Sequence, residues 1–201
     1  VVGFGYWGPN HARVLSRLPG VELVVVDPAP AQQARAREAH PDADVHGSLA
    51  DCRNLDGVII CSPPVTHLAV AQQAFDLGCH VLVEKPLALS VHEAEAMVQA
   101  ATDAGRTLMT GHIYDFHAGT TWLEEQATKG LYGSVRYLDA ARLAVGGYRS
   151  DANVMWDMAP HDLCLMHRVM GAWPTTLTDW AMERAGLVGP DVACRRPEFP
   201  D

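Results

Sequence analysis

Three glycines near the start of the chain follow a pattern that binds nucleotide phosphates. Gly3, Gly5 and Gly8 have the spacing G-x-G-x-x-G, with Tyr6 and Trp7 between the second and the third. In such a turn the first glycine permits a tight bend, the second lets a pyrophosphate approach the backbone, and the third allows a close helix-strand contact. Because an apolar run precedes the pattern and a helical stretch follows it, we predict that all five residues contact a dinucleotide.

An acidic residue, Asp27, ends the next apolar run, 19 positions after Gly8. A carboxylate at this place accepts hydrogen bonds from the 2′- and 3′-hydroxyls of a ribose and repels a 2′-phosphate. The sequence therefore favours NAD as the cofactor and disfavours NADP. The alternative is that Asp27, which precedes Pro28, only begins a turn.

Two further polar segments follow apolar runs that we interpret as the fourth and fifth strands. Ligands of doubly wound sheets bind at the carboxyl ends of the strands, so we predict cofactor contacts from both segments. For the first segment, the alternative, which is compatible with cofactor contact, is that Ser62 or Thr66 caps the next helix. For the second, the alternative is a solvated Glu-Lys pair. The predicted contacts are Ser62, Pro63, Pro64, His67, Glu84 and Lys85.

Lys85 is also a candidate catalytic residue. Pro86 follows it and confines its backbone to extended geometry, which restricts where the side chain points. A lysine beside a nicotinamide can hold a substrate hydroxyl and stabilise the developing alkoxide. We therefore expect Lys85 to act in the reaction as well as at the cofactor.

A second candidate for acid-base chemistry lies in the other half of the chain. Asp157 and His161 are four residues apart, so on a helix they share one face, and Pro160 is tolerated there only in a first turn. A helix N-terminus disfavours a charged imidazole, which keeps His161 available as a proton acceptor that Asp157 can orient. The alternative is that His161 is structural. Three flanking residues either contact a sugar or its phosphates or lie in a solvated loop: Arg142, Arg149 and Asn153.

The other histidines and the tryptophans receive structural interpretations. His112, His117 and His167 lack the spacing of a zinc site, and hydride transfer to a nicotinamide requires no metal, so we predict none. A set of three tryptophans is assigned to core packing: Trp122, Trp173 and Trp180.

The elements that must position these residues fall into two groups. In residues 1–111, short β-branched runs alternate with alanine-rich stretches, the pattern of βαβ units in a parallel sheet. We predict a Rossmann-type, doubly wound α/β domain there. Its strands are expected at residues 1–4, 22–26, near 45, 58–61, 80–83 and 107–110, and its helices at 7–18, 30–39, 67–77 and 91–104. Ser90 is expected to cap the last helix at its start, and Gly78 and Gly105 to follow helix ends.

Residues 112–201 have a different order of expected helices and strands. We predict helices at 119–128 and 157–170 and strands at 135–143 and 175–182, which suggests an α+β domain with a mostly antiparallel sheet. Too few strands are present to close such a sheet, so we expect the domain to be incomplete at its C-terminal end. The proline-rich residues 187–201 are expected to be disordered.

Composition excludes several classes of protein. The formal charge of -9 and the lack of a Lys/Arg cluster argue against a nucleic-acid surface, and no apolar run has the ~20 residues of a membrane span. The five cysteines are scattered without a C-x-x-C pair, and no secretion signal precedes them, which predicts a reducing cytoplasm.

Together these motifs resemble the glucose-fructose oxidoreductase, inositol dehydrogenase and MocA group of NAD(P)-dependent oxidoreductases. The resemblance rests on the glycine pattern, on Glu84-Lys85-Pro86, on Gly111-His112, and on Asp157-x-x-x-His161, in the family's order and spacing. It implies that Lys85, Asp157 and His161 are catalytic and that the full-length form is a homo-oligomer. The residues around Gly8 and Asp157 look like the branch that acts on nucleotide-linked and amino sugars, including UDP-N-acetylglucosamine 3-dehydrogenases.

The function that follows is hydride transfer between NAD(H) and a carbinol or ketone carbon of a sugar or sugar nucleotide. Two alternatives remain at this point. One is a dehydrogenase of a free inositol or other polyol, and the other is a truncated dinucleotide-binding protein without turnover. Neither the sugar nor the direction of the reaction follows from the sequence, and either Lys85 or His161 can be the base.

Overall fold

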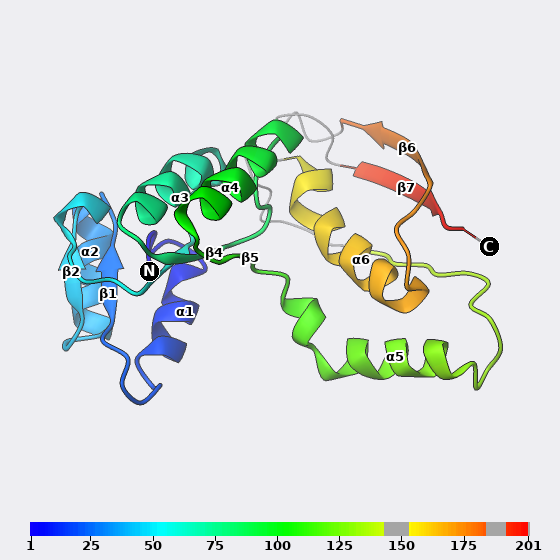
Figure 1. The fold of residues 1–201 in the computed structure, drawn as a ribbon, viewed down its shortest axis with the longest axis horizontal. Coiled ribbons are helices and arrows are strands. Elements are labelled where there is room, and N and C mark those ends of the chain that lie inside the picture. Colours follow the sequence, from blue (N-terminus) through cyan, green and yellow to red (C-terminus); the bar gives the residue numbers. More distant parts are fainter. Residues whose placement is uncertain (143–152, 184–191, 201) are drawn as a thin grey trace. The chain divides into compact units, whose positions relative to one another are not determined.

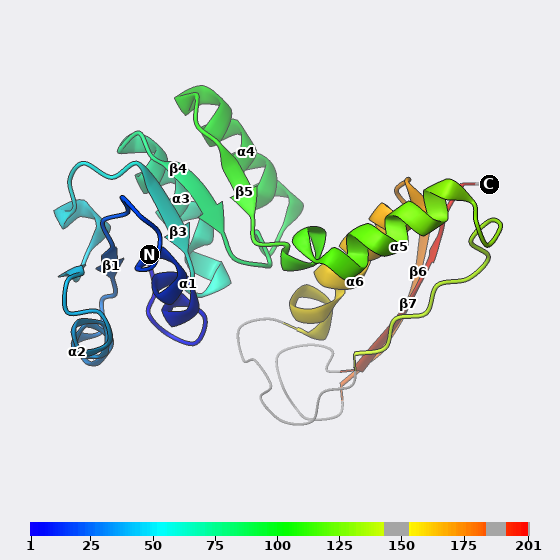
Figure 2. The same ribbon diagram turned by 90° about the horizontal axis from the view of Figure 1, so that it is seen from below.

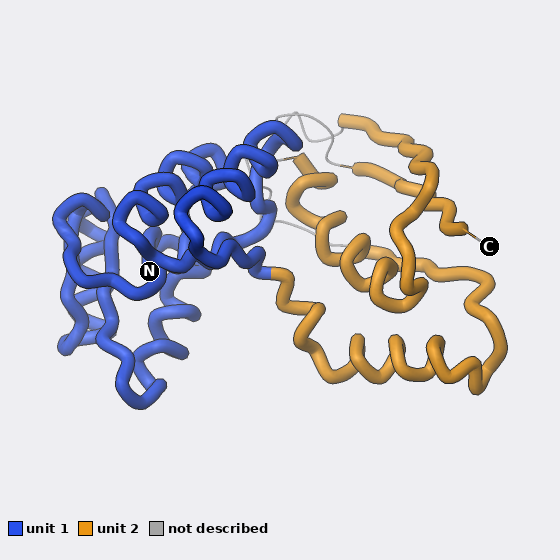
Figure 3. Tube along the Cα trace, viewed as in Figure 1, with its two compact units in different colours: residues 1–111 blue, residues 112–201 orange. Residues whose placement is uncertain are grey.

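The chain divides into two compact units, Val1–Gly111 and His112–Asp201 (Figure 3). The structure is a computed structural model that describes residues 1–142, 153–183 and 192–200. Within these ranges, no helix combines the length and the apolar character that crossing a membrane requires. Each unit is described by itself.

The first unit is built on a parallel sheet. Val2 bridges both β1 and β3 in parallel, which gives the order β2-β1-Val2-β3-β4-β5. This is the doubly wound order in which the first strand lies at the centre and ligands bind where the winding reverses, and it confirms the predicted fold class. Figure 2 displays β3, β4 and β5 side by side. The strands are β1 (Val24–Val26), β2 (Asp44–His46), β3 (Gly57–Ile60), β4 (His80–Val83) and β5 (Leu108–Thr110).

The first predicted strand, residues 1–4, is reduced to a bridge at Val2. Its amide donates to the Ile59 carbonyl at 2.8 Å and its carbonyl accepts from Cys61 at 2.7 Å. The strand ends there because Gly3 already has a φ of +92°, which turns the chain out of the extended conformation. The glycine turn therefore begins one residue after the sheet.

Four α-helices connect these strands. Ser90 caps the longest of them, with its Oγ accepting from the Glu93 amide at 3.2 Å, and Gly105 ends it in the left-handed conformation, as predicted. Figures 1 and 2 both place α3 and α4 side by side. The helices are α1 (Gly8–Leu15), α2 (Pro30–Ala39), α3 (His67–Asp76) and α4 (Val91–Ala104), with short 3-10 helices η1 (Leu49–Asp51) and η2 (Pro64–Thr66).

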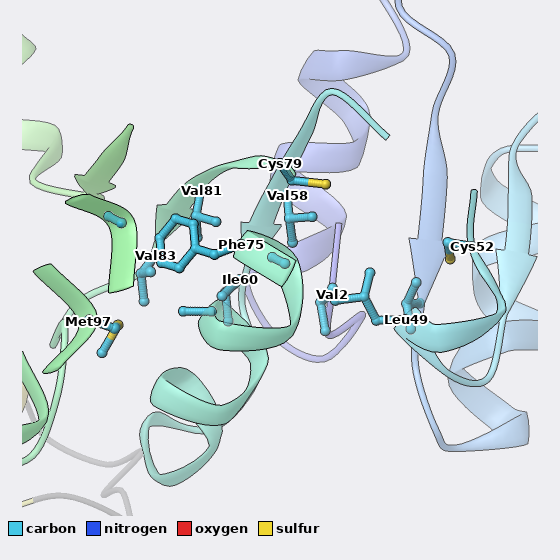
Figure 4. Close-up of a cluster of buried hydrophobic side chains, with 14 of the residues drawn as sticks. Val2, Leu49, Cys52, Val58, Ile60, Phe75, Cys79, Val81, Val83 and Met97 are labelled. Atoms are coloured by element: carbon cyan, nitrogen blue, oxygen red, sulfur yellow. The ribbon is translucent and has the colours of Figure 1, made fainter. Parts of the chain in front are cut away.

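One of two hydrophobic clusters in the first unit forms where α3 and α4 cover the sheet. Phe75 of α3 lies close to Ile60 of β3 and to Val81 and Val83 of β4 (Figure 4). Met97 of α4 is fully buried in the same cluster. Strands buried in this way read as continuous apolar runs, which is why the sequence predicted them.

The second unit contains helices and one antiparallel ladder. Its strands pair from Thr176 with Glu198 to Met182 with Val192. α5 and α6 pack against each other, and η3 contacts both. The elements are η3 (Ile113–Phe116), α5 (Ala118–Lys129), α6 (Val154–Met170), β6 (Thr176–Met182) and β7 (Val192–Glu198).

Three predictions for this unit are wrong within the described residues. Residues 135–142 form no strand, and the strand β7 occupies residues 192–198, where we expected disorder. β7 is ordered because β6 supplies a partner, whereas 135–142 have no described strand beside them. The tryptophans assigned to the core are exposed instead: Trp122, Trp173 and Trp180, by 55%, 64% and 54%.

Candidate cofactor and catalytic sites

The glycine turn is shaped by close backbone contacts at its first and third positions. A Cβ on Gly3 would lie 2.7 Å from the Ser62 amide nitrogen, and one on Gly8 would lie 1.9 Å from the Gly3 carbonyl oxygen. Nothing lies within 4 Å of the place that a Cβ on Gly5 would occupy. Gly5 therefore faces open space, which fits the close approach of a pyrophosphate at the second glycine.

The start of α1 offers donors to such a phosphate. No side chain caps this helix, and no acidic residue lies in its first turn. By contrast, side chains cap α4 and α6. Unsatisfied amides and the positive end of the helix dipole together favour an anion there. Tyr6 is 93% exposed and Trp7 38%, so the side chains between the glycines point away from the protein interior.

Asp27 links the end of β1 to the glycine turn. Its Oδ2 accepts from the Phe4 amide at 2.7 Å, and its Oδ1 accepts from the Ala29 amide at 2.9 Å. The second bond is the turn that was the alternative interpretation of this residue. A carboxylate has four acceptor positions, so both oxygens retain capacity for a ribose diol. The ribose contact remains a prediction.

The loop after β3 is held by its own hydroxyl groups. Ser62 Oγ and Thr66 Oγ1 are 2.7 Å apart, and Thr66 Oγ1 donates to the Pro63 carbonyl at 2.7 Å. No side chain caps α3, so the capping alternative for Ser62 and Thr66 is wrong. Pro63 is exposed and Pro64 is buried, which leaves Pro63 as the more accessible of the two predicted cofactor contacts.

His67 is buried and connects two loops. Its Nε2 lies 2.9 Å from the Ser62 carbonyl, and its Nδ1 lies 3.1 Å from the Pro86 carbonyl. Because both ring nitrogens face backbone carbonyls, the side chain ties the loop after β3 to the loop after β4. The structure thus gives His67 a supporting place, and the direct cofactor contact predicted for it remains a prediction.

Glu84 is not part of a solvated pair. Its side chain is 13% exposed, and its Oε1 lies 2.7 Å from His11 Nε2 in α1. Its Oε2 accepts from the Lys85 amide at 3.3 Å. Sequence reasoning missed His11; the available signal was a histidine in the first turn of the helix that follows the glycine pattern.

Cys61 directly follows β3 and is close enough to this carboxylate to sense its charge. Burial raises the pKa of its thiol to about 12, and the negative charge of Glu84 acts in the same direction. A thiol with this pKa stays neutral at physiological pH, so Cys61 is no nucleophile.

The second site begins at the start of α6. Asn153 caps the helix, its Oδ1 accepting from the amides of Met155 and Trp156 at 3.1 and 3.2 Å. Since α6 begins at Val154, Pro160 lies inside the helix and His161 more than one turn from its start. The expectation that Pro160 requires a first turn is therefore wrong. The dipole argument for a neutral His161 also fails, because that effect falls off within the first turn.

His161 is buried against an aromatic ring. The rings of Tyr114 and His161 meet edge to face with centroids 5.0 Å apart. Arg142 lies 5.0 Å above the Tyr114 ring and forms an ion pair with Asp162 at 2.9 Å. Arg142 is thus engaged within the protein, and Asn153 is a helix cap; Arg149 lies outside the described residues. Tyr114 contacts the candidate residue His161, and sequence reasoning did not single it out.

The predicted catalytic residues belong to different units. Lys85 lies in the first unit at the end of β4, whereas Asp157 and His161 lie in the first two turns of α6 in the second. Within the first unit, the structure brings the glycine turn, the Ser62 loop and Glu84 to the same edge of the sheet. The catalytic roles of Lys85, Asp157 and His161 remain predictions. No group of side chains suited to a metal ion occurs in the described part of the chain.

The chain matches known proteins over both units. The family described as an oxidoreductase family with an NAD-binding Rossmann fold (GFO_IDH_MocA) matches residues 1–112. A UDP-N-acetylglucosamine 3-dehydrogenase from Acidithiobacillus ferrooxidans is 36% identical over 179 residues, which cover 87% of this chain and 54% of that protein. A 2,7-anhydro-N-acetylneuraminate hydratase from Mediterraneibacter gnavus is 26% identical over 100% of this chain and 54% of its own.

A solved structure has the same fold. The WlbA dehydrogenase from Bordetella pertussis, in complex with NADH and UDP-GlcNAcA, superposes with a TM-score of 0.82 at 22% identity. The match covers 98% of this chain and 63% of that one. Measured against the two curated relatives above, the chain spans about half of their length.

Proposed function

Because the chain belongs to the Gfo/Idh/MocA family of oxidoreductases with an NAD-binding Rossmann fold, we propose that it transfers a hydride between NAD(H) and a carbinol or ketone carbon of a nucleotide-linked or amino sugar. The observation that carries the proposal is the glycine turn, where Gly5 faces open space beside the uncapped start of α1. The sugar class is supported by the relative named a UDP-N-acetylglucosamine 3-dehydrogenase.

The proposed roles follow the order of the motifs. The turn from Gly3 to Gly8 holds the pyrophosphate and Asp27 the adenosine ribose, while Pro63 and Lys85 contact the nicotinamide end. When bound, NAD supplies the hydride acceptor or donor. Lys85 Nζ holds the substrate oxygen and stabilises its negative charge, and Asp157 orients His161 or the substrate. The hydroxyl proton goes to Lys85 or His161, and the resemblance does not separate these two bases.

The first test measures cofactor choice. We expect NADH to bind more tightly than NADPH, because Asp27 would repel a 2′-phosphate. Fluorescence titration of the chain with each cofactor measures both affinities. Asp27→Asn keeps one oxygen acceptor for the backbone but removes the charge, so it should reduce the preference by ~10-fold, the size of one charge-assisted hydrogen bond.

Asp27→Ala and a matched control complete this test. Asp27→Ala loses the acceptor for Phe4 as well and should weaken both cofactors. Asp56→Ala, a change at an exposed aspartate of the same unit, should alter neither affinity. Equal binding of NADH and NADPH by the unmodified chain would refute the assignment of Asp27, and binding of neither by a folded chain would refute the cofactor site.

The second test measures turnover. We expect NADH to form when the chain is mixed with NAD⁺ and UDP-N-acetylglucosamine, and none to form with a free inositol. Turnover of the inositol alone would select the polyol alternative. Because one relative is named a hydratase, products are also analysed by mass spectrometry: water addition or loss without net NADH would contradict the proposed dehydrogenase.

A further inference from the structure

A histidine outside every predicted site connects α1 to the loop that carries Lys85. His11 Nε2 lies 2.7 Å from Glu84 Oε1, and the two residues are 73 positions apart in sequence. The side chains are 22% and 13% exposed, so solvent competes little for this contact. The pair joins the helix that follows the glycine turn to the end of β4.

The Glu84 carboxylate is restrained from two further directions. Its Oε2 accepts the Lys85 amide at 3.3 Å. On another side lies Gly111, directly after β5, where a Cβ would lie 3.2 Å from both carboxylate oxygens. Rotation of the carboxylate would break one of its contacts, and a side chain at position 111 would displace it. Its orientation is therefore set by three elements: α1, the end of β4 and the end of β5.

We infer that His11 is a positioning residue for Lys85, acting through Glu84. The argument has two steps. His11 fixes one carboxylate oxygen, and the other oxygen fixes the backbone amide from which the Lys85 side chain leaves. Orientation at this point matters because a misplacement of ~1 Å in a reacting group can cost ~100-fold in rate. This inference rests on the proposed function, in which Lys85 contacts the nicotinamide and the substrate oxygen.

Because the chain has few lysines, the chemical labelling of Lys85 can be measured separately. Only two lysines occur in the sequence, Lys85 and Lys129. Lys129 lies in the second unit, is 57% exposed and pairs with Glu125. Reductive methylation with ¹³C-formaldehyde, followed by peptide mass spectrometry, gives a labelling rate for each lysine. The ratio of the two rates reports the surroundings of Lys85, with Lys129 as the internal reference.

Three variants at position 11 separate the hydrogen bond from the bulk of the ring. Gln places an amide nitrogen where His has Nε2, whereas Asn reaches only as far as Nδ1, and Leu has no donor. We expect His11→Leu and His11→Asn to change the Lys85/Lys129 ratio by at least ~3-fold, a typical coupling between contacting residues, and His11→Gln to restore it. Gly111→Ala disturbs the same carboxylate from β5 and should change the ratio too.

Each outcome decides the inference. The inference is overturned if the Lys85/Lys129 labelling ratio in His11→Leu and Gly111→Ala equals that of the unmodified chain. It is also overturned if His11→Asn restores this ratio as fully as His11→Gln does. Circular dichroism and NADH titration of the same samples establish that the variants fold and bind cofactor. If the unmodified chain binds no NADH, the proposed function fails while the labelling ratio still reports whether His11 acts on Lys85. If it binds NADH and the ratios do not move, only the positioning role fails.

Discussion

Partly buried thiols are the residues whose chemistry the structure alters most clearly. Burial raises the pKa of Cys61 to about 12, and burial together with a hydrogen bond to Asp115 raises that of Cys164 to about 12. The thiolate is the reactive form of cysteine, so both residues are protected by their surroundings. Cys194, by contrast, is exposed on β7.

This difference predicts an order of modification. In the folded chain at about pH 8, a disulfide reagent such as dithiobis-nitrobenzoate should modify Cys194 first, and Cys61 and Cys164 at least ~10-fold more slowly, because they carry almost no thiolate. Peptide mapping of the modified sites measures the order. Early modification of Cys61 would contradict its burial, and Cys194→Ser should remove the fast phase.

Single residues differ in how far the sequence could predict them. Gly3, Gly8 and Asp27 form a local pattern with a known spacing, and the structure places all three around one turn. No sequence spacing links His11 and Tyr114 to their partners, Glu84 and His161, because those partners are far away in sequence. Contacts of this kind depend on the folded arrangement, which one sequence without its relatives does not display.

At the scale of elements, α6 depends on Asn153, the residue that caps its start. The Asn153 side chain satisfies two amides at the start of the helix, a role that no other described side chain takes there. We expect Asn153→Ala to lower the free energy of unfolding of the second unit by about 1 kcal/mol. Four of the five tryptophans lie in that unit, so urea unfolding followed by tryptophan fluorescence measures the change.

A matched substitution tests the specificity of this effect. Ser90→Ala removes the corresponding cap of α4 in the first unit, where Trp7 is the sole tryptophan. It should leave the main fluorescence transition in place and lower the midpoint seen by circular dichroism or NADH release. An equal shift of the tryptophan transition in both variants would mean that the units unfold together.

Elements of the first unit were predicted well, and those of the second unit less so. In β4, Val81 and Val83 are buried and Leu82 between them is half-buried, so a continuous apolar run marks the strand in the sequence. Whether residues 135–142 form a strand depends on a paired neighbouring strand, which their own sequence does not reveal. β7 is a strand because β6 lies beside it. The start of α6 was missed by three residues because Pro160 was taken to require a first turn, whereas the helix begins after the cap at Asn153.

For the whole molecule, the neutral thiols imply a dependence of stability on pH. Burial raises the pKa of four cysteines above the ordinary value of 9.0: Cys52, Cys61, Cys79 and Cys164. In the unfolded chain these thiols ionise above that value, while in the folded chain they keep their protons. Unfolding thus releases protons under alkaline conditions, and the free energy of unfolding falls as pH rises above about 9.

The measurement compares urea unfolding at about pH 7 and about pH 10, on either side of the ordinary thiol pKa. Cys61→Ala is the control, because tyrosines and lysines titrate in the same range and only the thiol contribution disappears in the variant. The variant should lose less stability than the unmodified chain between the two conditions. An identical loss would show that the Cys61 thiol does not contribute.

The glycine turn has a consequence for how this chain can diverge. At Gly8 a single methyl group would collide with the backbone of Gly3, so no neighbouring side chain can adjust to admit it. Tyr6, two positions earlier, projects almost entirely into solvent. Within six residues the chain therefore alternates between sites closed to mutation and sites open to it. Evolutionary drift can therefore change the exposed side chain at position 6 while Gly3 and Gly8 are retained.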